Sequence, residues 1–258
     1  MAFAPRLRAV ARPSKSVSIS VPIALLCFFA LLGSVRHGRI RLLGQLWPNG
    51  RRCLPVTPPE YRSEIGRVLE ERGYKTGAEL GVKQGQFSVE ILRSWPSCSR
   101  YVLVDVWKHQ KNYKDTANVD DAEHEKFYQE TMLVLSSWKE KLDVKRTWTS
   151  EAVKEIEDES LDFIYVDARH DFCGVYEDAS LYWPKLSPGG IMAGHDYISW
   201  QELNELEAPD WGLCANGTFL EASVKEAVDQ FASEHGLQVI ATLEEWPSWI
   251  VHKPLPQC

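Results

Sequence analysis

The sequence predicts an α/β protein with a doubly wound, Rossmann-like sheet that is mostly parallel and ends in an antiparallel hairpin. Short apolar runs of strand length alternate with segments whose apolar residues recur at helical spacing. This alternation is typical of βαβ units with helices on both faces of a parallel sheet. The last two apolar runs, 237–243 and 249–254, are joined only by "EEWPS". They are predicted to be antiparallel neighbours, because a parallel return needs a longer crossover.

Each element follows from its local pattern. The first helix is expected over 59–74, where Ile65, Val68 and Leu69 lie at helical spacing and Gly73 stops the helix. Parallel strands are predicted at 77–82, 101–107, 144–150, 161–167 and 189–196. Further helices are predicted at 87–95, 122–142, 150–156, 174–186 and 223–236.

Composition and charge divide the chain into a basic leader and an acidic domain. Of its 258 residues, 44% are hydrophobic and 10 are Trp, which is enough for a packed core. Residues 1–59 hold nine Lys and Arg and no acid, whereas all 36 acids follow Pro59 together with only 20 of the 29 bases. A surface this acidic repels the phosphate backbones of nucleic acids. Nucleic acid is therefore not an expected partner.

The leader contains an apolar run at residues 17–33, with bases on both sides. It is at the short end for a membrane-spanning helix and longer than most cleaved signal cores. We therefore expect a basic segment at 1–16, a signal anchor at 17–33, a stem or linker at 34–58 and the catalytic domain at 59–258. An acid-free leader with Arg and Ser also fits a transit sequence, and Leu32-Gly33-Ser34 is a weak cleavage site, so both alternatives stay open.

An anchor predicts a single-pass membrane protein of the Golgi or ER with a lumenal domain, and a transit sequence predicts a plastid or mitochondrial protein. The bases on the two sides of the run are nearly balanced, so they decide the orientation poorly. The sequon Asn216-Gly217-Thr218 fits a lumenal domain. The six cysteines have no metal-ligand spacing and indicate neither a zinc site nor a dense disulfide framework.

Chemistry is expected at the carboxyl ends of the strands, where open parallel sheets bind ligands. The first strand leads into a turn with Glu79, Gly81, Lys83 and Gly85. Glycines let a ligand approach the main chain, and the next helix start offers free N–H groups. Asp105 ends the second strand, where an acid can accept both hydroxyls of a ribose. Together these features indicate an adenosine-containing ligand.

Three other polar residues near strand ends are given local roles. Ser150 follows the third strand and is expected to cap the next helix, with a further contact to adenine as one possibility. Asp171 and Asp178 are each interpreted as a helix cap or a surface charge.

The fourth strand ends at Asp167 and the fifth at His195-Asp196. Parallel strand ends converge, and two carboxylates with a His can hold a divalent cation, with magnesium, calcium or manganese favoured over zinc. His170 lies three residues after Asp167. It is interpreted as a general base, a substrate clamp or an ordinary loop histidine.

These motifs resemble those of class I S-adenosylmethionine-dependent methyltransferases. The segments "AELGVKQGQFSVEIL", "YVLVDVW", "PSWIVHKP" and the run from "VDARH" to "GHDY" carry the resemblance. They are similar to a small-molecule group with a VDxxH and GHDY core, related to metal-dependent sugar O-methyltransferases. The resemblance extends over residues 60–254, nearly the whole predicted domain.

The resemblance implies roles for individual residues. Glu79, Gly81 and Gly85 would surround the methionine part of the cofactor. Asp105 would bind its ribose, and Asp167 would lie beside the sulfonium and the acceptor.

The metal-dependent relatives imply that Asp167 and Asp196 ligate a cation, with His195 as a third ligand. Two departures bear on this site: Ala168-Arg169 stand where family members often have Gly-Asp, and Phe172 replaces a Tyr. Metal dependence is therefore implied less directly than cofactor binding.

The implied reaction is in-line methyl transfer to an oxygen of a sugar, glycan or other small hydroxylated acceptor. His170 or His195 would collect the proton. Two alternatives stay open: an inactive, membrane-anchored cofactor-binding or scaffold protein, and a metal-dependent enzyme of other chemistry on the same fold.

Overall fold

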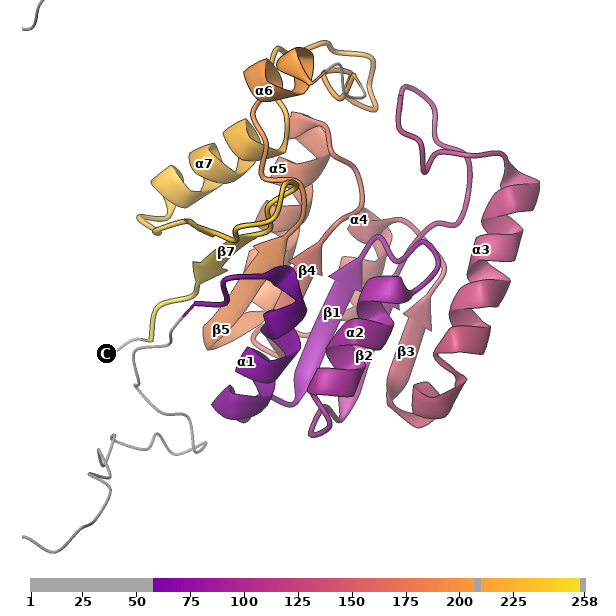
Figure 1. Ribbon diagram of the computed structural model, residues 1–258, viewed down its shortest axis with the longest axis vertical. Helices are drawn as coiled ribbons and strands as arrows, with labels where there is room; N and C mark the ends of the chain where they lie inside the picture. Colours follow the sequence, from indigo (N-terminus) through magenta and orange to yellow (C-terminus); the bar gives the residue numbers. More distant parts are fainter. Residues whose placement is uncertain (1–57, 207–209, 256–258) are drawn as a thin grey trace, which may run out of the picture. The chain divides into compact units, whose positions relative to one another are not determined.

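The computed structural model describes residues 58–206 and 210–255, which form a seven-stranded sheet with helices on both faces (Figure 1). The strand order is β3-β2-β1-β4-β5-β7-β6. The strands are β1 Thr76–Leu80, β2 Arg100–Val104, β3 Leu142–Lys145, β4 Leu161–Val166, β5 Leu186–Gly194, β6 Ile240–Ala241 and β7 Trp249–His252. Strands β1 to β5 are parallel, and β7 runs antiparallel to β5 and β6. The predicted fold class is confirmed.

The helices divide between the two faces of the sheet. They are α1 Ile65–Arg72, α2 Gln86–Ser94, α3 Asp121–Val134, α4 Thr149–Ala152, α5 Phe172–Tyr182, α6 Trp200–Glu205 and α7 Val224–Glu234. Helices α1, α2 and α3 pack on one face, and α4, α5 and α7 pack on the other. Each face therefore has its own hydrophobic core.

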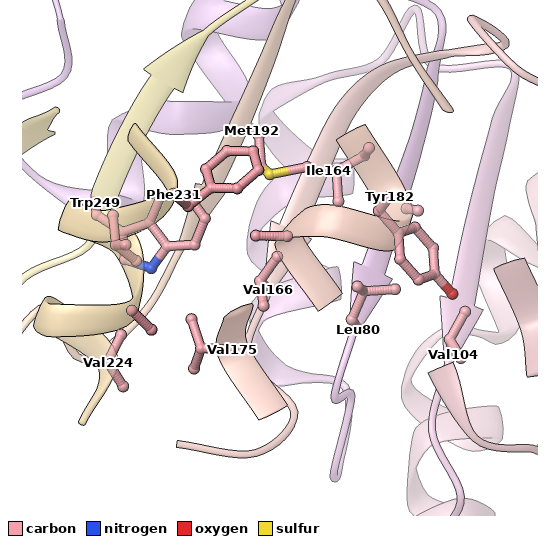
Figure 2. Close-up of a cluster of buried hydrophobic side chains, with 14 of the residues drawn as sticks. Leu80, Val104, Ile164, Val166, Val175, Tyr182, Met192, Val224, Phe231 and Trp249 are labelled. Carbon is pink, nitrogen blue, oxygen red and sulfur yellow. The ribbon is translucent and has the colours of Figure 1, made fainter. Parts of the chain in front are cut away.

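Strand residues alternate between these two cores, as the two-residue period of a strand requires. In β2, Tyr101 and Leu103 enter the core under α1 and α2, whereas Val102 and Val104 enter the other. Figure 2 shows Val104 in this second core, together with Tyr182 of α5. Burial on both faces explains why these strands appear in the sequence as continuous apolar runs.

The structure departs from the predicted elements where apolar periodicity is weak. The long helix expected over 122–142 ends as α3 at Val134 and continues as the 3-10 turn η2, Ser136–Lys141. The last but one strand, expected over 237–243, is reduced to the two residues of β6. Helix α6 was not predicted, although Ser199 and Glu202 form a capping box that the sequence already contains.

Within residues 58–206 and 210–255, no helix is both long enough and apolar enough to cross a membrane. This finding corrects the predicted localisation as a single-pass membrane protein of the Golgi or ER. The apolar run at 17–33 and its flanking segments lie outside the described residues.

A disulfide that the sequence analysis did not predict joins Cys173 to Cys214. It links the first turn of α5 to the segment after residue 210, across a sequence separation of 41 residues. Cys98 is buried as a free thiol. The six cysteines are dispersed along the sequence, and their spacing gives no pattern from which this pairing could be deduced.

Removing this disulfide should destabilise the domain. For a loop of this length, loss of the cross-link in a Cys173→Ala/Cys214→Ala variant should lower the free energy of unfolding by about 3–4 kcal/mol. Urea unfolding with and without dithiothreitol measures this change. The reductant should bring the wild type to the stability of the variant and leave the variant unchanged; equal stability of the two oxidised proteins would contradict the prediction.

Candidate functional site

A cleft of about 620 Å³ opens along the carboxyl ends of the five parallel strands. Its volume is in the range of small-molecule binding sites. The loops that line it follow each strand in turn: 81–83 after β1, 105–106 after β2, 147–150 after β3, 167–170 after β4 and 195–196 after β5. This is the edge at which the sequence placed the ligand site.

The turn after β1 has a backbone that only glycine allows at one position. Gly81 has φ +83°, and a Cβ atom there would lie 2.0 Å from the Asp167 carbonyl oxygen. Gly85 has φ +78° and precedes α2 as its N-cap. Lys83 is also left-handed, with φ 53°, although it has a side chain. The glycine turn expected from the sequence is therefore a close crossing of the β1 and β4 loops.

The Asp105 carboxylate holds this turn in place. Its Oδ2 accepts hydrogen bonds from the backbone N–H groups of Val82 and Lys83, both at 2.9 Å, and its Oδ1 accepts from the Trp107 N–H at 2.7 Å. A carboxylate offers about four acceptor positions, so capacity remains for one ligand hydroxyl. The sequence analysis had expected a ligand contact here and missed the structural role.

Glu79 lies inside β1 and is 1% exposed, although it also contributes to the cleft wall. Its Oε2 accepts hydrogen bonds from the Ser88 hydroxyl at 2.7 Å and the Tyr101 hydroxyl at 3.0 Å. Burial raises the pKa of Glu79 to about 8, because two neutral donors do not replace its lost hydration. A neutral Glu79 is therefore substantially populated at neutral pH.

His170 lies at the centre of three carboxylates. Its Nε2 is 3.1 Å from Asp167 Oδ1 and 3.5 Å from Asp196 Oδ2, and its Nδ1 is 3.2 Å from Asp115 Oδ2. Burial alone would lower the pKa of His170, but hydrogen bonds to Asp115 and Asp167 and the charge of Asp196 outweigh burial. The pKa of His170 is consequently raised well above its ordinary value, which favours the protonated ring unless a metal ion replaces the proton on Nε2.

Aromatic side chains hold the other side of this imidazole. The Trp211 ring lies 4.5 Å from the His170 ring, between centroids, and its Nε1–H donates to Asp115 Oδ2 at 2.9 Å. The Tyr113 hydroxyl donates to the Ala168 carbonyl at 3.2 Å and lies 3.1 Å from His170 Nδ1. Because this hydroxyl already donates elsewhere, it accepts from the Nδ1–H group.

At the end of β5, His195 Nδ1 lies 2.8 Å from Asp196 Oδ1. Burial would raise the pKa of Asp196, but the hydrogen bond with His195 and the charge of His170 lower it. Asp196 has φ 56°, a left-handed conformation that is uncommon for a non-glycine residue and recurs at functional sites. Both residues line the cleft, as predicted from the sequence.

The donor atoms of Asp167, His170 and Asp196 all lie within 4.8 Å of one another, which is close enough to share one metal ion. The set fits a divalent cation, since the His170 nitrogen opposite these two acids contacts the Asp115 carboxylate, as metal-bound imidazoles usually do. The predicted set contained His195 in place of His170. In the structure His195 instead contacts one carboxylate of the cluster from outside.

Comparisons with known proteins agree with this geometry. Residues 78–197 match a family model described as a methyltransferase domain. Over 97 residues the chain is 38% identical to the uncharacterized protein y4gI of Sinorhizobium fredii (strain NBRC 101917 / NGR234), which covers 38% of this chain. The chain spans only 10% of the length of that relative.

Two solved structures share the fold at low sequence identity. The O-methyltransferase TomG of Streptomyces achromogenes, in complex with SAM, has a TM-score of 0.53 and 14% identity, over 78% of this chain and 82% of that one. The O-methyltransferase of Bacillus cereus, in complex with SAH, has a TM-score of 0.52 and 13% identity, over 77% and 83%.

Residues 78–197 therefore resemble a methyltransferase domain, and the chain shares the fold of these two O-methyltransferase structures. The remaining residues singled out in the sequence take their places in the same fold. Asp171 caps α5, as one interpretation held, by accepting from the Gly174 N–H at 3.1 Å. Ser150 lines the cleft inside α4, whose N-cap is Trp148, so the expected cap is wrong.

The interpretation of Asp178 as a helix cap or a surface charge is wrong. It is 3% exposed, lies within α5 and contributes to the cleft wall. Burial raises the pKa of Asp178 to about 7. The spacing "VxxD" in the sequence indicates this burial, because it places Asp178 one helical turn after Val175, on the buried side of α5.

Glu79→Gln should change how stability depends on pH. The pKa of Glu79 is about 8 in the folded protein and near 4.5 when unfolded. Because the folded pKa is raised, its stabilising effect is complete below pH about 4.5 and is lost as pH rises towards 8. Between pH 6 and 8, the free energy of unfolding of the wild type should fall by about 2 kcal/mol relative to the variant, which stays neutral.

Urea unfolding at the two pH values tests this difference. Glu140→Gln, which removes an exposed carboxylate, should follow the wild type. Parallel curves for the wild type and Glu79→Gln would show that Glu79 does not hold a proton in the folded state.

Proposed function

We propose that residues 59–258 form a catalytic domain that transfers a methyl group from S-adenosylmethionine to an oxygen of a sugar or another small hydroxylated acceptor, with the help of a divalent cation. One observation supports the proposal: the glycine turn that Asp105 holds by hydrogen bonds and the acidic cluster around His170 line the same cleft. Methyl transfer needs donor and acceptor held together in line, so both binding sites must adjoin.

The cofactor side is assigned to β1, β2 and β3. Gly81 lets the ligand approach the main chain, and Asp105 has acceptor capacity left for a ribose hydroxyl. Ser150 and Thr149 lie in the same wall, beyond β3. The adenine would lie at this end, because the ribose acid precedes it in the strand order β1-β2-β3.

The acceptor side is assigned to β4 and β5. Asp167, His170 and Asp196 would hold the cation, which when bound would lower the pKa of an acceptor hydroxyl. Asp115 would orient His170 through Nδ1. Oxygen-rich ligation favours magnesium or manganese.

His195 is the better proton acceptor of the two candidate histidines. His170 would bind the cation through Nε2 and contacts Asp115 through Nδ1, so neither of its nitrogens is free to take a proton. His195 lines the cleft, and its Nδ1 is fixed by Asp196, which leaves Nε2 for the acceptor. The sequence left both histidines as candidates, and the geometry favours His195.

Cofactor binding is the first experiment. Calorimetric titration of the domain with S-adenosylmethionine and S-adenosylhomocysteine should show saturable binding, weakened at least about 100-fold by Asp105→Ala, because the turn and the ribose contact are lost together. Asp158→Ala, at an exposed surface acid, is the matched control. No binding by a folded wild-type domain would refute the proposed function.

The role of His195 is tested by separating turnover from affinity. His195→Gln should lower methyl transfer to the best acceptor among nucleotide sugars, monosaccharides and catechols by about 100-fold or more, with S-adenosylhomocysteine affinity unchanged within about twofold. His235→Gln, at the end of α7, should leave both unchanged. Equal losses of turnover and affinity in His195→Gln would show that the residue shapes the cofactor site instead.

A further inference from the structure

One cation of the cleft has no assigned role. Arg62, in the 3-10 turn η1 Arg62–Glu64, lines the cleft with its guanidinium 5.2 Å from the centre of the Phe87 ring. The guanidinium interacts with the Tyr165 hydroxyl by charge and by a hydrogen bond, and within residues 58–206 and 210–255 no ion pair joins it to a carboxylate. An arginine placed this way against an apolar wall keeps donors for an anionic ligand.

The chain fixes the position of Arg62 from outside the cleft. A side-chain oxygen of Glu244 accepts a hydrogen bond from the Arg62 backbone N–H, and the Leu243 N–H donates to the Glu60 carbonyl at 2.8 Å. These contacts join η1 and the residues just before it to the connection between β6 and β7. The backbone at Arg62 is thus held in place by hydrogen bonds, which reduces the conformational entropy lost when a ligand binds.

The surroundings of Arg62 match the end of the ligand opposite to adenine. On the proposed function the nucleoside would extend from the reacting centre towards Asp105 and β3, so the amino-acid arm would extend away from β3. Arg62 lies on that side, close enough to Asp167 for their charges to interact. Next to it, α2 begins after Gly85 without a side-chain cap.

The arm carries an ammonium and a carboxylate, and the cleft is predominantly acidic. Acids suit the ammonium and the sulfonium but repel the carboxylate, which needs a cation. Arg169 already has partners within the protein, because its guanidinium donates to Asp171 at 2.6 Å and to the Asn112 and Leu213 carbonyls. Lys83 lines the cleft but is exposed, so its charge is better screened by water.

We infer that Arg62 binds the carboxylate of the cofactor's amino-acid arm and thereby selects for it. This inference rests on the proposed function. Arg62 is a specificity-determining residue on this account, since it touches the ligand at a distance from the transferred methyl group.

The experiment compares two ligands that differ in this carboxylate alone. S-adenosylhomocysteine and its decarboxylated analogue, S-adenosyl-3-thiopropylamine, are titrated into the wild type and into Arg62→Gln, Arg62→Lys and Arg67→Gln. Arg67 is the matched control, because it lies one turn further on in α1 and is exposed and paired with Glu64 and Glu71. Thermal unfolding of each variant verifies that it is folded.

The wild type and Arg67→Gln should bind S-adenosylhomocysteine at least about tenfold more tightly than the amine. Arg62→Gln should weaken S-adenosylhomocysteine alone, so that the ratio of the two dissociation constants falls towards one, and Arg62→Lys should give an intermediate ratio. An unchanged ratio in folded Arg62→Gln would overturn the inference.

Two other results separate this inference from the proposed function. If the wild type binds both ligands equally well, the role of Arg62 is wrong while the methyltransferase proposal stands. If the folded wild type binds neither, the proposed function fails and the inference fails with it.

Discussion

The close crossing of two loops at Gly81 and Asp167 is the constraint on which the cleft depends. The chain builds the sheet outwards from β1 to β3 and then returns to add β4 and β5 on the other side, so the strand order reverses between β1 and β4. Loops that diverge at such a point leave a crevice for a ligand. Here the Asp167 carbonyl fills the space that a side chain at position 81 would need. Glycine at 81 therefore sets where Asp167, and with it the acceptor site, can lie.

The second constraint is electrostatic. Three partly or fully buried acids, Asp115, Asp167 and Asp196, would repel one another strongly if no positive charge lay between them. His170 supplies that charge when it is protonated, and a divalent cation bound by the neutral ring would supply it instead. Either positive charge stabilises the same arrangement of acids. The cluster can therefore be preorganised before a cation or an acceptor arrives.

The sequence predicts the sheet and the strand-end acids well, because both follow from local patterns. Asp105, Asp167 and Asp196 end apolar runs, so the strands alone fix their positions. The partners of these acids were not predictable. His170 replaces His195 in the cluster because the loop after β4 folds back over the cleft, which no spacing within "VDARH" encodes. Arg62 precedes β1 and is distant in sequence from the other cleft residues, and it reaches the site through contacts of η1 with the β6–β7 connection and with Phe87 of α2.

The acceptor side of the cleft depends even more on contacts between distant segments. Trp211 packs against His170 and donates to Asp115, so a segment that follows β5 completes a cluster built mainly after β2 and β4. The Cys173–Cys214 disulfide ties this segment to the start of α5. The sequence of this segment can vary without disturbing the sheet or the glycine turn, because strands β1 to β4 pair with one another without it. On the proposed function, the cofactor side of the cleft would therefore follow from the fold, whereas the segment that the disulfide holds in place would select the acceptor.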